Sequence, residues 1–283
     1  MIDTESSNKK LDFNYKNIFN KNYLKFDCGI ENDDLRHISF MSFLYSLAGF
    51  NSIDVSFNIE VVESVNKSLK KANEKAKELE FNLISNTFIT VSLEDISFTN
   101  PSFEYTFSKI LNYRVKIIEL HIQKADIEVN TKLIEKVSKI ANNQLISLSL
   151  NRKSFSNASL IELIKKARDI LKSRLIIELH GTHFSGVKNS YNETLQAIST
   201  VDIINKQLKY QDIKFRKLPI IIAGGVNSFT SQLAKQCNVE YQGLCVAKSG
   251  FDLFMYKNQN EIISNNNEIK KSVELIKAKF LNF

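Results

Sequence analysis

Short apolar segments alternate with longer amphipathic segments from about residue 22 to the end of the chain. Short apolar runs are typical of buried parallel strands, and stretches with an apolar face every three or four residues are typical of covering helices. The alternation occurs eight times, which predicts an α/β fold, a single (β/α)8 TIM-type barrel. The expected strands are 23–28, 52–57, 87–93, 115–122, 145–150, 175–180, 220–223 and 243–247.

Each expected strand is followed by a stretch with helical periodicity. Asn58, Pro101 and Asn157 stand where helices should begin, as a side-chain cap or as a proline in the first turn. Gly29 and Gly181 follow expected strands, where the chain must turn sharply. The expected helices are 33–48, 58–80, 101–113, 126–142, 157–172, 190–208, 228–237 and 258–280.

The length of the chain suits one barrel with little left over, since 283 residues compare with ~250 for a typical TIM barrel. Residues 21–283 are therefore expected to form a single barrel domain. Residues 1–20 are polar and rich in Asn and Lys, which predicts a loose arm or a cap over the bottom of the barrel.

The clearest local motif runs from Pro219 through an apolar strand into two glycines and a helix start. In TIM barrels the loops after the seventh and eighth strands commonly hold phosphate, because backbone amides and a helix N-terminus attract an anion. A tight strand-to-helix turn without a ligand is the alternative. The predicted phosphate-binding residues are Gly224, Gly225, Val226 and Asn227 from the seventh unit and Lys248, Ser249 and Gly250 from the eighth.

The fourth and sixth expected strands carry the same sequence, Ile-Ile-Glu-Leu-His. Side chains alternate along a strand, so Glu119, His121 and Gln123 share one face. The outer face of a barrel strand meets apolar helices, so this polar face must point inward, and Glu178 and His180 must do the same. Alternate strands contribute to the same interior layers. We therefore expect the two histidines at a common mouth and the two glutamates one layer deeper.

Lys25 and Asp54 complete the predicted interior polar group, since Asp54 on the second strand can approach Lys25 on the first. Buried carboxylates require partners, so Lys25 or a histidine is expected to pair with the glutamates. General acid–base chemistry or ligand binding at the mouth is one interpretation, and Schiff-base chemistry at Lys25 is a further option. A purely structural polar network, with Lys25 in an interior ion pair, is the alternative. The candidate catalytic residues are Glu119, His121, Glu178, His180, Lys25 and Asp54.

Composition excludes several classes of function. The net charge of +7 comes from lysines spread over solvated helix faces, as in proteins of AT-rich genomes, so no nucleic-acid partner is expected. No apolar run approaches the ~20 residues that span a bilayer, and the N-terminus lacks a signal-peptide pattern. Cys28, Cys237 and Cys245 are too scattered for a disulfide framework, and no metal site or cofactor is expected. These features favour the cytoplasm, or the plastid stroma if the gene is plastid-encoded.

Short motifs in the same order along most of the chain resemble the barrel-like part of the cyanobacterial light-dependent period protein (LdpA) family. This resemblance implies proteins with iron–sulfur clusters that help to pass cellular redox state to the circadian clock and accompany clock-input components. The matched positions include Gln123 and Ser185, which join the predicted ligand-binding residues. The motifs are Lys25-Phe-Asp-Cys-Gly, Ser46-Leu-Ala-Gly-Phe-Asn-Ser-Ile-Asp-Val, Val91-Ser-Leu-Glu-Asp, Ile118-Glu-Leu-His-Ile-Gln, Ser185-Gly and Ala223-Gly-Gly-Val-Asn-Ser-Phe-Thr.

The sequence departs from that family where the cysteine-rich segment is expected, because no cysteine lies between Asp95 and Arg114. Clusters need several thiolates, so no iron–sulfur cluster is expected. The family also has Asp and Arg near the positions of His180 and Thr182.

These observations leave two functions and one structural role open for the chain. One is an LdpA-like regulatory or accessory protein, reduced to a barrel, that binds a small phosphorylated ligand and clock-input or other regulatory proteins. The other is a TIM-barrel lyase, aldolase or isomerase acting on a phosphorylated small molecule; a barrel with only a structural role is the third option.

Overall fold

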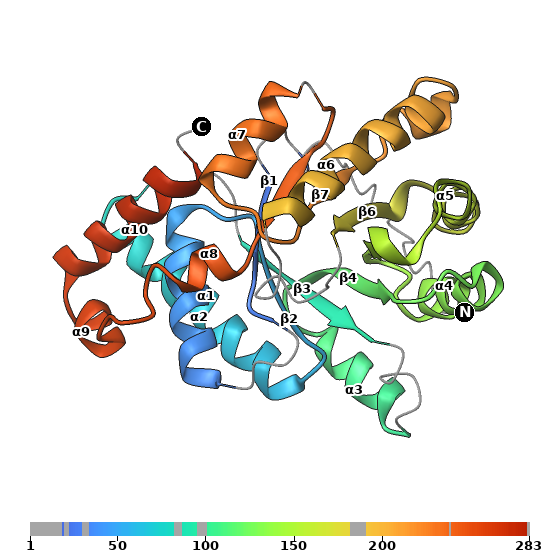
Figure 1. The fold of residues 1–283 in the computed structure, drawn as a ribbon. Coiled ribbons are helices and arrows are strands. Elements are labelled where there is room, and N and C mark those ends of the chain that lie inside the picture. Colours follow the sequence, from blue (N-terminus) through green and yellow to red (C-terminus); the bar gives the residue numbers. More distant parts are fainter. Residues whose placement is uncertain are drawn as a thin grey trace, which may run out of the picture.

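The computed structural model describes residues 19, 23–29, 34–81, 87–94, 101–181, 191–237 and 239–281. Eight parallel strands form a closed barrel in which each strand pairs with its neighbours in sequence and β8 closes on β1, with helices around the outside (Figure 1). The predicted TIM-type barrel is therefore confirmed. The strands are β1 Tyr23–Asp27, β2 Ser52–Ser56, β3 Phe88–Leu93, β4 Val115–Ile122, β5 Leu145–Asn151, β6 Leu175–His180, β7 Ile220–Ile222 and β8 Gly243–Val246.

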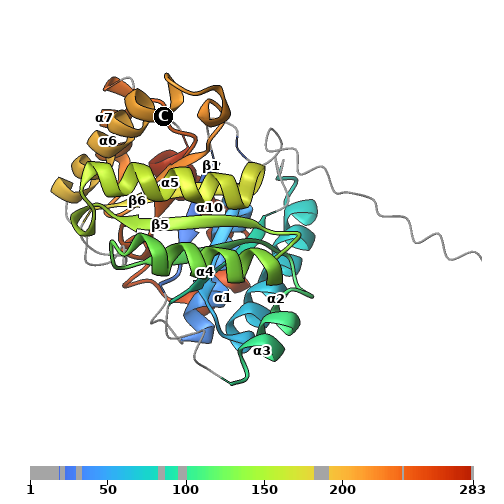
Figure 2. The same ribbon diagram turned by 90° about the vertical axis from the view of Figure 1, so that its right-hand side faces the viewer.

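The helices lie close to the predicted ranges, and α4 and α5 lie side by side along β5 (Figure 2). None of the described helices is long and apolar enough to cross a membrane. The α-helices are α1 Leu35–Ala48, α2 Ile59–Glu78, α3 Phe103–Ile110, α4 Ile127–Ile140, α5 Asn157–Leu171, α6 Tyr191–Ile204, α7 Ser228–Gln236, α8 Lys248–Phe251, α9 Gln259–Ser264 and α10 Asn266–Phe280. Short helical turns are η3 Arg152–Ser154, η4 Lys172–Arg174, η7 Ile213–Phe215 and the π-helix η6 Asn205–Lys209.

Some helix boundaries differ from the sequence prediction for local reasons. The expected helix 258–280 is two helices, because the side chain of Asn265 accepts hydrogen bonds from the amides of Asn267 and Glu268 and starts α10 afresh. The segment after β8, expected as a loop, forms the short helix α8. Asn58 caps α2 as predicted, whereas Ser156 rather than Asn157 caps α5.

The lower end of the barrel interior is closed by apolar side chains. Tyr23, Ile117, Leu145, Ile176 and Ile221 lie at the N-terminal parts of their strands and pack together. Phe19 packs beneath them, with its ring centroid 4.6 Å from that of Tyr23. Phe19 belongs to the expected arm 1–20, so this residue covers the barrel bottom, while the rest of that segment lies outside the described residues.

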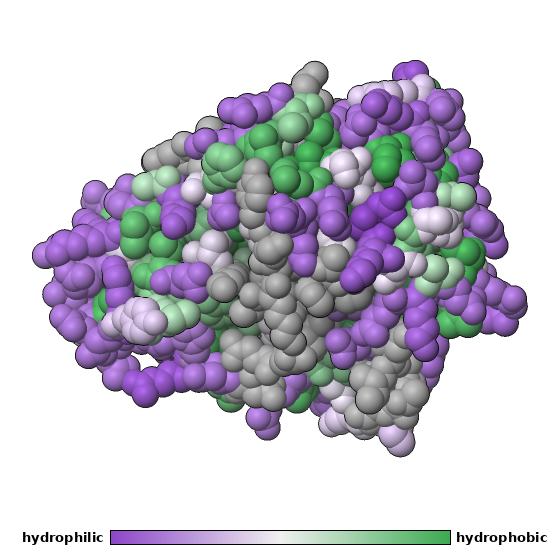
Figure 3. Space-filling view, in the orientation of Figure 1, coloured by the Kyte–Doolittle hydropathy of each residue, from purple (hydrophilic) through white to green (hydrophobic). Residues whose placement is uncertain are grey.

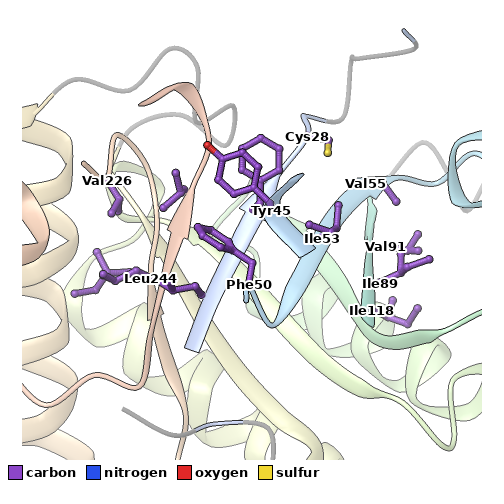
Figure 4. Close-up of a cluster of buried hydrophobic side chains, with 14 of the residues drawn as sticks. Cys28, Tyr45, Phe50, Ile53, Val55, Ile89, Val91, Ile118, Val226 and Leu244 are labelled. Atoms are coloured by element: carbon purple, nitrogen blue, oxygen red, sulfur yellow. The ribbon is translucent and has the colours of Figure 1, made fainter. Parts of the chain in front are cut away.

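The outer faces of the strands carry the second apolar layer, which packs under the helices (Figure 4). On the β1 side, Phe26 stacks on Tyr45 of α1 with ring centroids 4.0 Å apart. The outward faces of the helices are mostly polar in the view of Figure 3, with apolar side chains near α7, where Phe229 is 58% exposed. Apolar residues thus fill both the barrel bottom and the outer shell, and the charged interior residues lie above the bottom layer.

One buried lysine lies far from that polar interior. Lys209, the last residue of the π-helix η6, is 1% exposed, and its Nζ has no hydrogen-bond partner within the described part of the chain. Burial lowers the pKa of Lys209 to about 8, although the carboxylate of Glu240 opposes the shift. Keeping Lys209 charged and buried therefore lowers the stability of the folded state at neutral pH.

Lys209→Met is expected to raise the free energy of unfolding at pH 7 by about 1–3 kcal/mol, because one pKa unit corresponds to ~1.4 kcal/mol. The folded-state pKa lies below the unfolded value of roughly 10.4, so the wild-type protein should gain stability as pH rises between these two values. Urea unfolding from pH 7 to 10 measures both proteins. The control is Lys206→Met, since Lys206 is 67% exposed and pairs with Asp202. A stability difference that stays constant across this pH range would contradict the prediction.

Candidate functional site

The ammonium of Lys25 lies in the middle of the barrel interior, and carboxylates from three other strands converge on it. Its Nζ is 2.7 Å from Asp54 Oδ2 on β2, 2.5 Å from Glu119 Oε2 on β4 and 2.6 Å from Glu178 Oε2 on β6. None of these side chains is more than 3% exposed. The structure therefore brings together the four residues that the sequence predicted to pair inside the barrel.

The barrel geometry explains this convergence. Alternate strands of a TIM barrel supply the same interior layer, and the three carboxylates come from β2, β4 and β6. Lys25 comes from β1, and its long stem brings the ammonium to that layer. Ser92 on β3 donates a hydrogen bond to the second oxygen of Asp54 over 2.8 Å. Asp54 is thus held in one orientation by partners from the two strands that flank β2.

Two glutamate–histidine pairs are part of this network. His121 Nε2 lies 3.1 Å from Glu119 Oε1, and His180 Nε2 lies 3.3 Å from Glu178 Oε1. The two imidazole rings are buried and their centroids are 6.5 Å apart. Because both histidines are at the C-terminal ends of their strands, they face the common mouth that the Ile-Ile-Glu-Leu-His repeat predicted.

Burial and neighbouring charges give the acidic groups different pKa values. Burial raises the pKa of Asp54 to about 6 although Lys25 opposes it, and burial together with the Asp54 carboxylate raises the pKa of Asp27 to about 7. Burial alone would also raise the pKa of Glu178, but the Lys25 ammonium and the contact with His180 hold it at about 2. Glu178 is therefore a permanent carboxylate, while Asp27 and Asp54 can carry protons near neutral pH.

The basic groups are shifted by the same environment. Burial alone would lower the pKa of Lys25, but Asp54 and the two glutamates raise it well above its usual value. Burial likewise opposes the charged form of His121, yet the hydrogen bond to Glu119 leaves its pKa raised. An amine must be neutral to attack a carbonyl, so the geometry disfavours the Schiff-base role and favours Lys25 as a fixed positive charge.

Ser147 and Ser149 on β5 face the same interior and were not among the predicted site residues. Strand register places Ser147 beside Glu119, and Ser149 between His121 and Glu178. Both hydroxyls are buried, and neither has a hydrogen-bond partner within the described part of the chain. The alternation of serine with leucine and isoleucine along this strand is the sequence signal that could have identified them.

The predicted phosphate-binding turn lies beside the strand that carries His180. The Ala223 amide donates to the carbonyl of Leu179 over 2.9 Å, so Gly224 follows next to the end of β6. Gly224 and Gly225 have φ angles of 79° and 73°, a left-handed conformation that glycine adopts readily. Within the described residues, the amides of Gly224, Gly225 and Val226 donate no hydrogen bond. Amides without partners in a turn before a helix are suited to an anion.

Other residues of the predicted phosphate site have structural partners. The side chain of Asn227 accepts from the amides of Phe229 and Thr230 and caps α7. The hydroxyl of Ser249 donates to the carbonyl of Val226 over 2.7 Å and ties the β8 loop to the β7 loop. Val226 is itself 2% exposed and packs in the outer apolar layer. Asn227 and Ser249 therefore hold the shape of the turn.

Gly250 is not placed to contact a ligand. A Cβ at this position would lie 2.6 Å from a ring carbon of Phe26 and 2.7 Å from the hydroxyl of Tyr45, so the glycine allows α8 to pack on the outer layer. Gln123 lies exposed just beyond β4. Lys248 begins α8, and its side chain, like the whole of Ser185, lies outside the described part of the structure.

Three donor groups in the interior lie close enough to share a cation. One donor atom from each of Glu119, Glu178 and His180 lies within 4.8 Å of the others, and all three side chains are buried. No metal site was expected from the sequence, because metal-binding motifs are recognised by the spacing of ligands that are close together in the chain. Here the donors come from β4 and β6, which lie on either side of β5 in the closed barrel.

No protein-family model and no curated protein matches the sequence. The fold is similar to that of a truncated form of 3-deoxy-D-arabino-heptulosonate 7-phosphate synthase from Thermotoga maritima, with a TM-score of 0.54, 15% identity, and coverage of 92% of this chain and 89% of that chain. It is also similar to a protein described as a deoxyribose-phosphate aldolase from Coccidioides immitis, with a TM-score of 0.53, 10% identity, and coverage of 87% and 85%. At these identities the likeness shows the TIM-barrel fold.

Proposed function

We propose that this chain is a TIM-barrel lyase, aldolase or isomerase that transfers protons on a phosphorylated small molecule. The observation that carries the proposal is the pair of buried Glu–His dyads that face each other at the mouth, with imidazole centroids 6.5 Å apart. Aldol cleavage and carbonyl isomerisation both need one group that removes a proton and another that supplies one. Two neighbouring histidines that both contact the substrate meet this need.

The roles of the residues follow from their environments. His121 and His180 are the groups that exchange protons with the substrate. Glu119 and Glu178 are positioning residues, because each carboxylate fixes the orientation of its imidazole and stabilises the imidazolium. Lys25 fixes both carboxylates through its ammonium. The raised pKa of Lys25 argues against an imine route, so the proposed chemistry passes through an enolate-type intermediate whose oxygen a protonated histidine stabilises.

The phosphate group of the substrate is proposed to bind the amides of Gly224, Gly225 and Val226. Their position next to the end of β6 would bring the ligand close to His180. The similar structures named above are described as acting on, or forming, phosphorylated sugars, which supports the same substrate class for this barrel.

Deuterium exchange tests the proposed reaction without knowledge of the full substrate. The protein is incubated in D₂O with dihydroxyacetone phosphate, glyceraldehyde 3-phosphate and phosphorylated pentoses, hexoses and heptulosonates, and NMR follows deuterium entering beside the carbonyl. Catalysed exchange with one phosphorylated compound and none with its unphosphorylated form is expected. His37→Gln is the control, since His37 lies on α1 outside the barrel interior. An absence of exchange and of carbon–carbon cleavage across the whole panel would refute the proposal.

Binding of phosphate at the glycine turn has its own prediction. Inorganic phosphate or a sugar phosphate at ten times its Kd should stabilise the native protein by ~1.4 kcal/mol, seen as a rise in Tm. Gly225→Asp should abolish this rise, because Asp tolerates the left-handed conformation but places a carboxylate where the anion would lie. Gly49→Asp is the matched control, at a glycine with φ of 97° at the end of α1. Equal ligand-induced shifts in both variants would contradict the predicted site.

The regulatory role implied by the LdpA resemblance stays a prediction. It would require this barrel to bind clock-input or other regulatory proteins, and the enzyme proposal accounts for the polar interior without such a partner. Catalytic turnover that depends on the Glu–His dyads would favour the enzyme over the regulatory protein.

A further inference from the structure

The upper interior of the barrel holds several carboxyl groups around a single lysine. Asp54, Glu119 and Glu178 surround one ammonium, and the pKa of Asp27 close by is raised by burial and by the Asp54 carboxylate. Buried carboxylates are unfavourable unless each is neutralised by a proton or a cation. With one lysine present, the remaining neutralisation comes from protons on Asp27, Asp54 or His121, or from a bound cation.

The orientation of the two glutamates indicates where that charge would lie. The Lys25 ammonium contacts the Oε2 atom of each glutamate, so each carboxylate directs its Oε1 atom toward the histidine side of the site. One donor atom from each of Glu119, Glu178 and His180 lies within 4.8 Å of the others. Two carboxylates and one imidazole at such spacing match the donor set and the size of a metal-ion coordination sphere.

The serine hydroxyls of β5 provide an independent indication of a polar occupant. Ser149 lies between His121 and Glu178 in register, Ser147 lies beside Glu119, and both hydroxyls are buried without a hydrogen-bond partner among the described residues. Buried hydroxyls are normally satisfied by a protein group, a water or a ligand. Waters that complete the coordination of a metal ion would satisfy them.

We propose that Glu119, Glu178 and His180 bind a divalent transition-metal ion of the Mn²⁺, Fe²⁺ or Zn²⁺ class. A mixed set of carboxylate and imidazole donors suits these ions, whereas an all-oxygen set suits Ca²⁺ or Mg²⁺ and a thiolate set suits Cu⁺. Ser147 and Ser149 are positioning residues that hold metal-bound water. This inference goes beyond the proposed reaction and describes a different state of the same site. His180 is a ligand when the ion is bound, and it exchanges protons with the substrate only in the metal-free protein.

Titration of the EDTA-treated full-length protein with Mn²⁺, followed by electron paramagnetic resonance, tests the site. One tightly bound Mn²⁺ per chain is expected, with a hyperfine coupling to an imidazole nitrogen, and Zn²⁺ should displace it. His180→Gln should remove the nitrogen coupling and weaken binding at least tenfold, and Glu178→Gln should weaken binding without removing the coupling. His37→Gln, in which a histidine outside the barrel interior is replaced, should behave as the wild type.

Several outcomes would overturn the metal site. If the wild-type protein binds neither Mn²⁺ nor Zn²⁺ specifically, the proposed site is wrong. Bound Mn²⁺ that shows no coupling to a nitrogen would also contradict it, because His180 would then not be a ligand. Unchanged affinity and coupling in a folded His180→Gln protein would place the ion elsewhere. Because no substrate is present in these measurements, loss of the metal site and failure of the proton-transfer reaction are distinguishable results.

Discussion

Replacing Lys25 with Met is expected to destabilise the barrel by about 3–5 kcal/mol, the usual cost of leaving one side of a buried ion pair uncompensated. Three carboxylates lie within 2.7 Å of the Lys25 ammonium, and the substitution leaves all of them in the same buried layer. The methionine fills the space of the lysine stem, so the lost stability comes from the missing positive charge and not from a cavity. The raised pKa of Lys25 has the same origin.

Urea unfolding at neutral pH, followed by circular dichroism, measures this effect. Lys116→Met is the matched control, because Lys116 also lies on a barrel strand but is exposed at the outer edge of β4. Its substitution should change stability by less than about 0.5 kcal/mol. A Lys25→Met protein as stable as the wild type would mean that the carboxylates are neutral at this pH, and the fixed-charge role of Lys25 would then be wrong.

The fold and the centre of the site could be predicted because both depend on short-range periodicity. Eight apolar segments separated by helical patterns specify the strand order of a barrel. The alternation within Ile-Ile-Glu-Leu-His determines that Glu119 and His121 point to one face, and the apolar outer layer determines which face that is. The layering of alternate strands then brings Glu119 and Glu178 together, although they are far apart in sequence.

The features that sequence reasoning missed depend on tertiary contacts. Gly250 is a glycine because α8 packs on Phe26 and Tyr45, which no local motif indicates. The three donor groups that could bind a cation come together only in the closed barrel, since Glu178 and His180 are on β6 and Glu119 is on β4. The neighbours of the Ser147 and Ser149 hydroxyls, and their lack of a hydrogen-bond partner among the described residues, are evident only in the folded structure. Such information comes from packing rather than from periodicity.

Glu119→Gln is expected to lower the rate of substrate deuterium exchange by roughly 10²–10⁴-fold, the range of general acid–base effects. The change preserves shape and leaves Asp54 and Glu178 to pair with Lys25, so the fold should persist. What is lost is the carboxylate that orients His121 and raises its pKa. Since Glu119 and His121 act as one unit, Glu119→Gln combined with His121→Gln should lower the rate little further than either single change.

The exchange assay with the phosphorylated compound that responds in the panel measures all three variants, and thermal unfolding verifies that each is folded. Glu60→Gln, which removes an exposed glutamate in the first turn of α2, serves as the control and should retain the wild-type rate. Losses that multiply in the double variant would show that Glu119 and His121 act independently. In that case Glu119 would act through its ion pair with Lys25, and His121 would exchange the proton without help from Glu119. The double variant therefore distinguishes the role of the glutamate in the ion pair from its role in the dyad.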